Sequence, residues 1–306
     1  MQKTHTKEQN KDYDIQALFR QLSAKDGEEL DDYFSPNLAV TDVLRVILYK
    51  FFLLVDFYKE RIVLFDNAED LHQFRVNIRK SRAFLKEFDF LQYDLQLGSI
   101  SDTLGALAKQ TNHKRDLDVM QTQLASLVDG QYDTISARIM QEQKEEHIHI
   151  QNLLTSQRVE AFFTDYRAAL IHNTLLDANC NTMHTKALIK KVVTKLHQKI
   201  IKKITRLEKN FSIEKLHTIR IALKRFRYLL EEFQVILGKK EVETVIKNGK
   251  MLQALLGDYN DSITQEQLLQ PYLDDVLLYK LYEYQKETLE TIMKKLHHFK
   301  KEDFTL

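Results

Sequence analysis

Apolar residues recur every three or four positions along most of the chain, which predicts a protein built from long amphipathic helices. Helix starts are expected at Ser35-Pro36, Asp66-Asn67 and Ser212, and breaks at Gly98, Asp129-Gly130 and Gly238. The expected helices cover about residues 36–65, 66–97, 100–128, 132–154, 183–209, 213–237, 240–256 and 271–299. Seven Gly and two Pro among 306 residues leave few turns for a sheet protein, so the expected fold class is all-α.

The helical pattern occurs twice, at a constant offset of 145 residues. Residues 71–88 align with 216–233 without a gap, with seven identities in eighteen positions, and farther along Asp116 falls on Asp261. A constant offset over several elements predicts the duplication of a helical unit. We therefore expect two four-helix bundles, formed by residues 36–158 and 182–306, with a connecting segment at 159–181 and a partly helical N-terminal extension at 1–35.

Each copy of the repeated helix carries one histidine and three cations on a narrow face. The two sets are His72, Arg75, Arg79 and Arg82, and His217, Arg220, Lys224 and Arg227. On a helical wheel each set lies within about 80°, beside an apolar arc. The preceding helices add Lys50 in the first half and Lys191, Lys195 and Lys202 in the second. Rows of like charge cost a few tenths of a kcal/mol per neighbouring pair, which a bound polyanion would offset; Arg and Lys both suit phosphate oxygens.

The charge of the chain is strongly segregated, although its formal net value is only +1. Residues 186–227 hold fourteen Lys/Arg against two acids, a local balance of +12 that leaves −11 for the remainder. Such segregation indicates a specific anionic partner or a strong internal field. The most apolar run, residues 43–58, is interrupted by Arg45, Lys50 and Asp56 and is too broken to span a bilayer. With a single cysteine, Cys180, the composition suits a reducing compartment, so we expect a soluble, cytoplasmic protein without a membrane partner.

Two other functions compete with polyanion binding. One is a metal-dependent phosphohydrolase or phosphotransfer enzyme, in which His72 or His217 would act as nucleophile or acid/base and Asp116 or Asp261 would hold the metal. The chain has no Gly-rich phosphate loop, no HExxH pattern and no Cys/His spacing typical of zinc, so we expect neither a metal nor another cofactor. The other is nucleic-acid binding, for which Tyr228 is the one aromatic residue near the stripes that could stack on a base.

The repeated motif Leu-His-x-x-Arg-x-x-x-(Arg/Lys)-(Arg/Lys)-x-Arg resembles the CHAD domain, the conserved histidine α-helical domain. Leu104-Gly105, the run Arg115-Asp116-Leu117-Asp118 and the run from Leu255 to Asp261 extend the resemblance, which covers about residues 36–299. It implies two four-helix bundles related by a pseudo-twofold axis, around a basic channel that binds inorganic polyphosphate without catalysis. Carried over by position, the channel would hold the two sets of His and cations together with Lys50, Lys191, Lys195 and Lys202.

The chain departs from the family pattern in two places. The spacer between Gly105 and Arg115 is longer than usual, and Glu231 stands where the first half has Lys86, so the two halves need not bind equally. Many relatives carry a CYTH-type triphosphate-hydrolysing domain as well; this chain shows no Glu-x-Glu-x-Lys motif and is expected to stand alone. Storage, attachment to polyphosphate granules, phosphate sensing and scaffolding stay open as biological purposes.

Overall fold

The protein is all-α, as predicted. The computed structural model describes residues 38–91, 96–127, 133–172, 184–269 and 275–301, in which all regular structure is helical. The helices are α2 (Val40–Leu64), α3 (Ala68–Glu87), α4 (Gln96–Gln110), α5 (Asn112–Leu127), α6 (Asp133–Leu154), α7 (Gln157–His172), α8 (Thr185–Lys209), α9 (Ile213–Leu237), α10 (Lys239–Leu269) and α11 (Asp275–Lys301), with a short 3-10 helix at Asp89–Leu91. Among these helices, none combines the length and apolar character that crossing a membrane requires.

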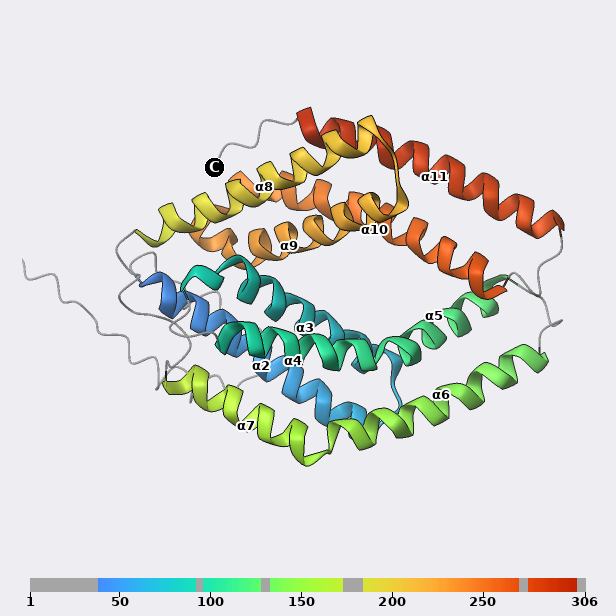
Figure 1. The fold of residues 1–306 in the computed structure, drawn as a ribbon, viewed down its shortest axis with the longest axis horizontal. Helices are drawn as coiled ribbons and strands as arrows, with labels where there is room; N and C mark the ends of the chain where they lie inside the picture. The colour runs from blue at the N-terminus through green and yellow to red at the C-terminus, as the bar shows by residue number, and fades with distance from the viewer. Residues whose placement is uncertain (1–37, 92–95, 128–132, 173–183, 270–274, 302–306) are drawn as a thin grey trace, which may run out of the picture.

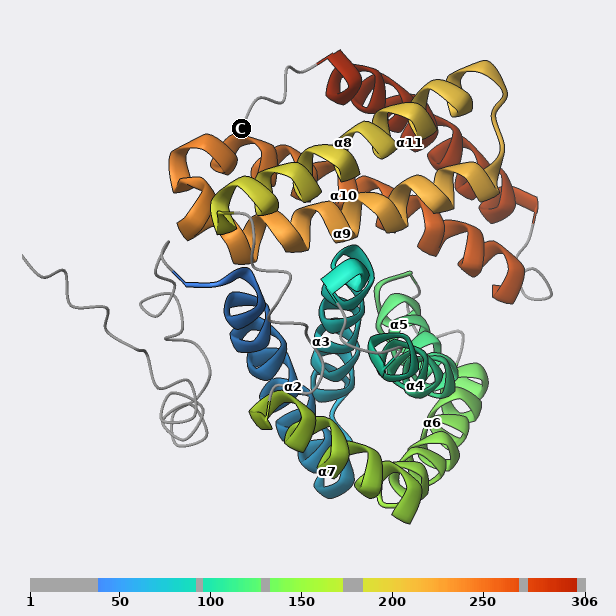
Figure 2. The same ribbon diagram turned by 60° about the vertical axis from the view of Figure 1, so that its left-hand side comes forward.

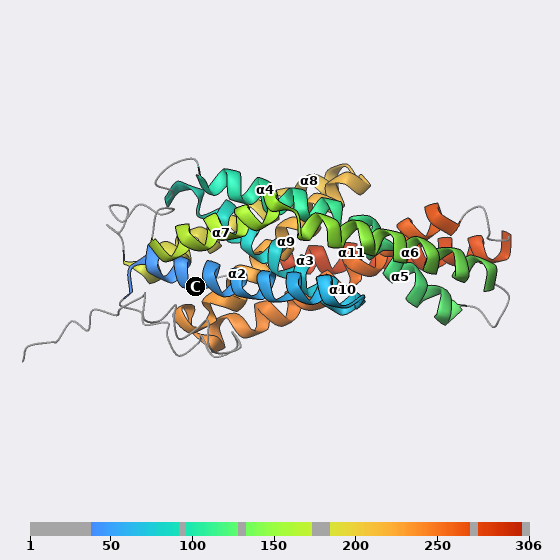
Figure 3. The same ribbon diagram turned by 90° about the horizontal axis from the view of Figure 1, so that it is seen from below.

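The helices form two groups, α2–α7 and α8–α11, which meet where α3 packs against α9 (Figures 1 and 2). In the first group α2 packs on α3, α3 on α4, α5 on α6, and both α6 and α7 on α2. In the second group α8 packs on α9, α9 on α10, α10 on α11, and α11 on α8. Seen from below, most helices run along the long axis of the molecule (Figure 3). The packing order is thus the same in both groups if α4–α5 and α6–α7 each count as one broken helix.

The helix bounds follow the 145-residue offset closely. α2 and α8 are both 25 residues long, and α3 and α9 begin at Ala68 and Ile213. The N-caps correspond as well, because Asn67 accepts a hydrogen bond from the backbone N–H of Glu69 and Ser212 accepts one from that of Lys215. A side-chain oxygen at the N-cap satisfies a donor that the first turn leaves unpaired. These coincidences support the proposed duplication.

An aromatic cluster joins the two groups of helices. Phe84 and Phe88 of α3 pack on Phe233 of α9, with ring centroids 5.3 and 5.7 Å apart, and Phe51 of α2 lies 5.5 Å from Phe84. All four rings are fully buried. Buried aromatic rings contribute large apolar areas and favour tilted or edge-to-face pairs. The cluster therefore fixes α3 against α9, and most buried apolar residues of both groups form a single core.

The third predicted helix, 100–128, is in fact two helices. α4 ends at Gln110 and α5 begins at Asn112, with a break at Thr111. The guanidinium of Arg75 on α3 donates to the carbonyl oxygen of Ala108 at 2.5 Å, to Oγ1 of Thr111 at 2.6 Å and to Oδ1 of Asn112 at 2.7 Å. Oγ1 of Thr111 also donates to the carbonyl oxygen of Ala108 at 3.0 Å, so Arg75 and Thr111 both bond to the end of α4.

In the second half the corresponding helix is continuous. α10 runs from Lys239 to Leu269, past Leu256, where the sequence pattern placed its end. No side chain corresponding to Thr111 or Asn112 is available to Arg220, since those positions hold Leu256 and Gly257.

The segment 159–181, predicted as an irregular connection, is helical through His172. Phe163 and Tyr166 of α7 pack on Phe52 of α2, with ring centroids 5.9 and 5.5 Å apart. Arg45 of α2 donates to the carbonyl oxygens of Leu170 and Ile171 at the end of α7. Contacts with a distant helix thus stabilise α7, and the first group includes it. The domain boundary at residue 158 stays a prediction, and the packing of α7 favours a later one, after His172.

The predicted start of the first long helix is wrong. α2 begins at Val40, after the N-cap Ala39, instead of at Pro36. Ser35-Pro36, the N-terminal extension 1–35, Pro271 and the Asn-rich stretch 173–181 lie outside the described residues.

Candidate anion-binding site

The two basic stripes converge where α3 meets α9. Burial, together with the nearby charges of Arg220 and Arg79, lowers the pKa of Lys224 to about 8. The pKa of Arg220 is lowered by burial and by Arg79, with Asp261 acting against the shift, and that of Arg75 falls to about 10 through burial and the charge of Arg79. Arg79 therefore acts on cations of both halves. We call Arg75, Arg79, Arg220 and Lys224 the cationic cluster.

The charges at this junction lack full hydrogen-bond partners. The Nε atoms of Arg79, Arg82 and Arg220 are buried and bond to no group in the described part of the chain. A buried donor without a partner costs about 1–3 kcal/mol, more when it is charged. An anion that reached these guanidinium groups would remove this cost and the mutual repulsion together. The arrangement therefore makes this junction a candidate anion-binding site.

The two histidines lie in different surroundings. His72 is half-buried, and burial together with the charges of Arg115, Arg79 and Arg75 lowers its pKa, against the opposing charge of Glu69. His217 is exposed on the surface near the start of α9. His72 is therefore a neutral hydrogen-bonding group at neutral pH, beside the cationic cluster. The equivalence that the repeat predicts for the two side chains does not extend to their burial.

One carboxylate from each half flanks the cationic cluster. Burial raises the pKa of Asp116, Arg75 opposes that shift, and the charge of Asp261 adds to it. Asp261 in turn acts on both Arg220 and Lys224. The two acids therefore lie near each other and near the cations. Elsewhere in the described ranges too, His, Cys, Asp and Glu do not gather in groups of three or more that could hold a metal ion.

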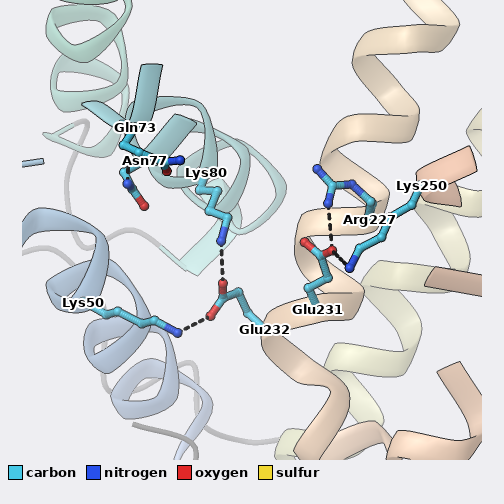
Figure 4. A network of polar contacts seen from close by, with 8 residues as sticks. All are labelled: Lys50, Gln73, Asn77, Lys80, Arg227, Glu231, Glu232 and Lys250. Carbon is cyan, nitrogen blue, oxygen red and sulfur yellow. Dashed lines mark hydrogen bonds and ion pairs between the residues drawn. The ribbon is translucent and has the colours of Figure 1, made fainter. Parts of the chain in front are cut away.

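Gly105 gives Arg82 its space against α4. A Cβ at this position would lie 2.8 Å from Cζ of Arg82, closer than real side chains approach. The second half has Lys250 at the corresponding position. There Arg227 donates to Glu231 at 2.7 Å, and Lys250 shares the same Glu231 oxygen (Figure 4). Arg227 also donates to Gln253 at 2.8 Å. Arg227 is thus neutralised by a neighbour that the first half does not have.

Lys50 is also neutralised by an acid, so we do not count it in the cationic cluster. Its Nζ and that of Lys80 are each 3.1 Å from a carboxylate oxygen of Glu232, whose side chain is only 6% exposed (Figure 4). In the opposite direction Arg225 of α9 donates to Glu87 of α3 at 2.9 Å. Each half thus extends a cation to a glutamate of the other.

These glutamates were not among the predicted functional residues. Glu87 and Glu232 are identical and 145 positions apart, and so correspond in the repeat, as do Lys80 and Arg225. The identity was therefore the signal that could have found them. An acid repeated in register inside a basic helix indicates a paired partner.

The lysines of α8 are exposed and lie away from the junction. Lys191, Lys195 and Lys202 all face solvent. α8 packs on the side of α9 away from α3 (Figures 1 and 2). The charges that shift the pKa of Lys224 come from α3, α9 and α10. These lysines thus form a basic surface row separate from the cationic cluster.

Tyr228 is not placed to stack on a nucleic-acid base. The residue is 4% exposed. Arg227 lies 4.9 Å and Lys80 6.0 Å from its ring centroid, at distances typical of cation–π contacts. The one aromatic residue that favoured nucleic-acid binding is therefore a packing residue.

The chain belongs to the CHAD domain family, because its sequence matches the CHAD domain over residues 57–270, more than half of its length. Its fold is similar to the crystal structure of the CHAD domain from the plant Ricinus communis, with a TM-score of 0.69, 20% identity and 87% of each chain covered. It is also similar to PptA from Streptomyces chartreusis, with a TM-score of 0.57, 16% identity, and 86% of this chain and 98% of that one covered. At such identities the structural likeness shows the fold alone. No curated protein matches the sequence.

Proposed function

We propose that this protein binds inorganic polyphosphate, without catalysis, at the cationic cluster between α3 and α9. The observation that supports it most is that Arg79 of one half meets Arg220 and Lys224 of the other, with guanidinium Nε atoms buried and unpartnered within the described residues. Membership of the CHAD domain family, which is known for polyphosphate binding, points the same way. A polyanion is the ligand class whose charge matches such a cluster.

The structure suggests a graded role for the predicted residues. The cationic cluster would bind consecutive phosphates through charge-assisted hydrogen bonds, bidentate where Arg contributes. In this proposal His72 and Arg82 would flank the cluster in the first half, and His217 and Arg227 would flank it in the second. Because Lys191, Lys195 and Lys202 are exposed on α8, they would contact only the part of a long polyphosphate chain that leaves the cluster. Lys50 would contribute only if Glu232 released it.

Binding without catalysis is favoured over phosphohydrolysis by the placement of the histidines. A repeated catalytic role would need two equivalent side chains, whereas His72 is half-buried among arginines and His217 is exposed. Release of phosphate from polyphosphate with magnesium or manganese, lost in His72→Ala or His217→Ala, would support the enzyme instead.

Calorimetry with long-chain polyphosphate and with orthophosphate tests the proposal. We expect the long chain to bind far more tightly, and the double variant Arg79→Glu/Lys224→Glu to lose at least about 100-fold in affinity, since hydrogen bonds to charged groups contribute about 1.5–3 kcal/mol each. The matched control is Lys280→Glu/Lys286→Glu, which makes the same charge change at exposed positions of α11. Equal losses in the two double variants, or no preference for the long chain, would refute the proposal.

A further inference from the structure

A groove between the start of α9 and the middle of α10 is not explained by polyphosphate binding. It has a volume of about 450 Å³, within the range of small-molecule sites, roughly 300–1,000 Å³. Its walls are mainly apolar and include Ile213, Leu216, Leu256 and Ile263, with Tyr259 beside them. Inorganic phosphate gains nothing from such walls. An organic group does, because apolar surface leaves water on binding.

The same position in the first half is lined by polar side chains that pair with their neighbours. Leu256, Tyr259, Asn260 and Ile263 correspond at the 145-residue offset to Thr111, Lys114, Arg115 and Asp118. There Arg75 bonds to Thr111, and Lys114 pairs with Asp118 at 2.8 Å and with Asp66 at 3.0 Å. The second half has no such polar partners at these positions and forms an apolar hollow instead. The difference arises at the very residues that line the groove.

The groove also reaches the cationic cluster, because Arg220 lines the groove and is a member of that cluster. The Nε atom of Arg220 is buried and has no hydrogen-bond partner in the described ranges. His217 and Asn260 add polar groups to the same lining. Glu214 lies on the outer side, in the first turn of α9, where its carboxylate would repel an anion. A ligand with one anionic end would therefore direct that end toward Arg220 and its organic end toward Ile213.

We propose that this groove binds the organic group of a nucleoside polyphosphate or a similar organic polyphosphate, with the phosphate chain extending from Arg220 into the cationic cluster. The proposal rests on the proposed phosphate-binding role of that cluster. It adds a second ligand class, held by one half only. Tyr259 would lie beside the bound ring, and Asn260 could hydrogen-bond its polar edge.

The test compares ATP with inorganic tripolyphosphate by calorimetry, without added metal. Both probes carry three phosphates, and tripolyphosphate bears the higher charge, so a purely electrostatic site prefers tripolyphosphate. We expect ATP to bind about tenfold more tightly, equivalent to about 1.4 kcal/mol. ATP binding no tighter than tripolyphosphate would overturn the proposal.

Two matched variants locate the effect. Ile213 is 50% and Ile221 39% exposed, and both lie on α9, but only Ile213 lines the groove. We expect Ile213→Glu to bring the ratio of ATP to tripolyphosphate affinity down to about one, and Ile221→Glu to leave it at about ten. Circular dichroism melting checks that both fold. An equal ratio in the two variants would contradict the inference.

The long-chain experiment separates this failure from failure of the proposed function. Binding of long-chain polyphosphate without any advantage for ATP would support the proposed function of the cationic cluster and refute the proposed role of the groove. An advantage for ATP that depends on Ile213, without binding of long-chain polyphosphate, would do the reverse.

Discussion

Polyphosphate affinity should fall about tenfold between pH 7 and pH 9, and Lys224 should cause the fall. In the free protein, burial and neighbouring cations lower the pKa of Lys224 from 10.5 to about 8. A bound polyanion reverses the repulsion and returns this pKa toward its ordinary value. Free Lys224 is then about 90% protonated at pH 7 and about 10% at pH 9, and at pH 9 binding must take up a proton at a cost of about 1.4 kcal/mol. Arg75, with a pKa of about 10, adds to the effect only above this range.

Calorimetry at pH 7, 8 and 9, in pairs of buffers with different ionisation enthalpies, measures both the affinity and the protons taken up. Lys224→Arg is the matched variant, because an arginine at this place keeps the charge but stays protonated across the range. We expect the wild-type chain to take up close to one proton at pH 9 and Lys224→Arg to take up almost none. If the two proteins lose affinity in parallel as pH rises, the assignment to Lys224 is wrong.

The same shift in the pKa of Lys224 should make the fold more stable as the pH rises, whereas it makes polyphosphate binding weaker. The folded-state pKa of Lys224 lies below its unfolded value, so between about pH 8 and 10.5 the unfolded chain binds more protons than the folded one. The free energy of unfolding therefore increases with pH across this window because of Lys224. Outside the window Lys224 adds no pH dependence to it. Urea unfolding of wild type and Lys224→Met at pH 7.5 and 9.5 measures it: the variant should be relatively more stable at the lower pH.

Three further outcomes follow from the packing. Gly105→Ala should displace the guanidinium of Arg82 and weaken long-chain polyphosphate binding about tenfold or more in calorimetry, as expected for one hydrogen bond to a charged group; unchanged affinity would exclude a contact through Arg82. Phe233→Ala should lower the free energy of unfolding by about 3–5 kcal/mol in urea titrations, because it empties the core between α3 and α9; a loss below about 1 kcal/mol would contradict that role. Glu232→Gln should destabilise the fold by about 1–3 kcal/mol yet raise polyphosphate affinity, since it releases two lysines that remain partly solvated; reduced affinity would contradict their neutralised state.

The helices and basic stripes could be predicted because their signals are local. Leu216, Ile219 and Leu223 repeat at helical spacing, and Arg220 and Lys224 follow the same spacing on the adjoining face. Ser212 marks the start of α9 and Gly238 its end, where the glycine adopts a φ of 110°. Local sequence determines such features with little help from the rest of the fold.

The features that could not be predicted depend on distant residues. The break at Thr111 requires Arg75, which lies 36 positions earlier. Burial of Phe163 against α2 stabilises α7, whereas the asparagines after His172 suggested a loop. The neutralisation of Lys50 requires Glu232, 182 positions away. Residue types alone identify a cation but cannot show which cations are already paired.

The exchange of cations between α3 and α9 has the symmetry of a homodimer interface. Lys80 meets Glu232 and Arg225 meets Glu87, so the same two positions of the repeat contact each other in both directions. Such reciprocity is the property of an isologous contact between identical subunits. Under the proposed duplication, covalent linkage of the two halves makes their association intramolecular, at an effective concentration of order millimolar or above. Each half would then be free to diverge, so that one could be polar where the other forms a groove while the contact between them persists.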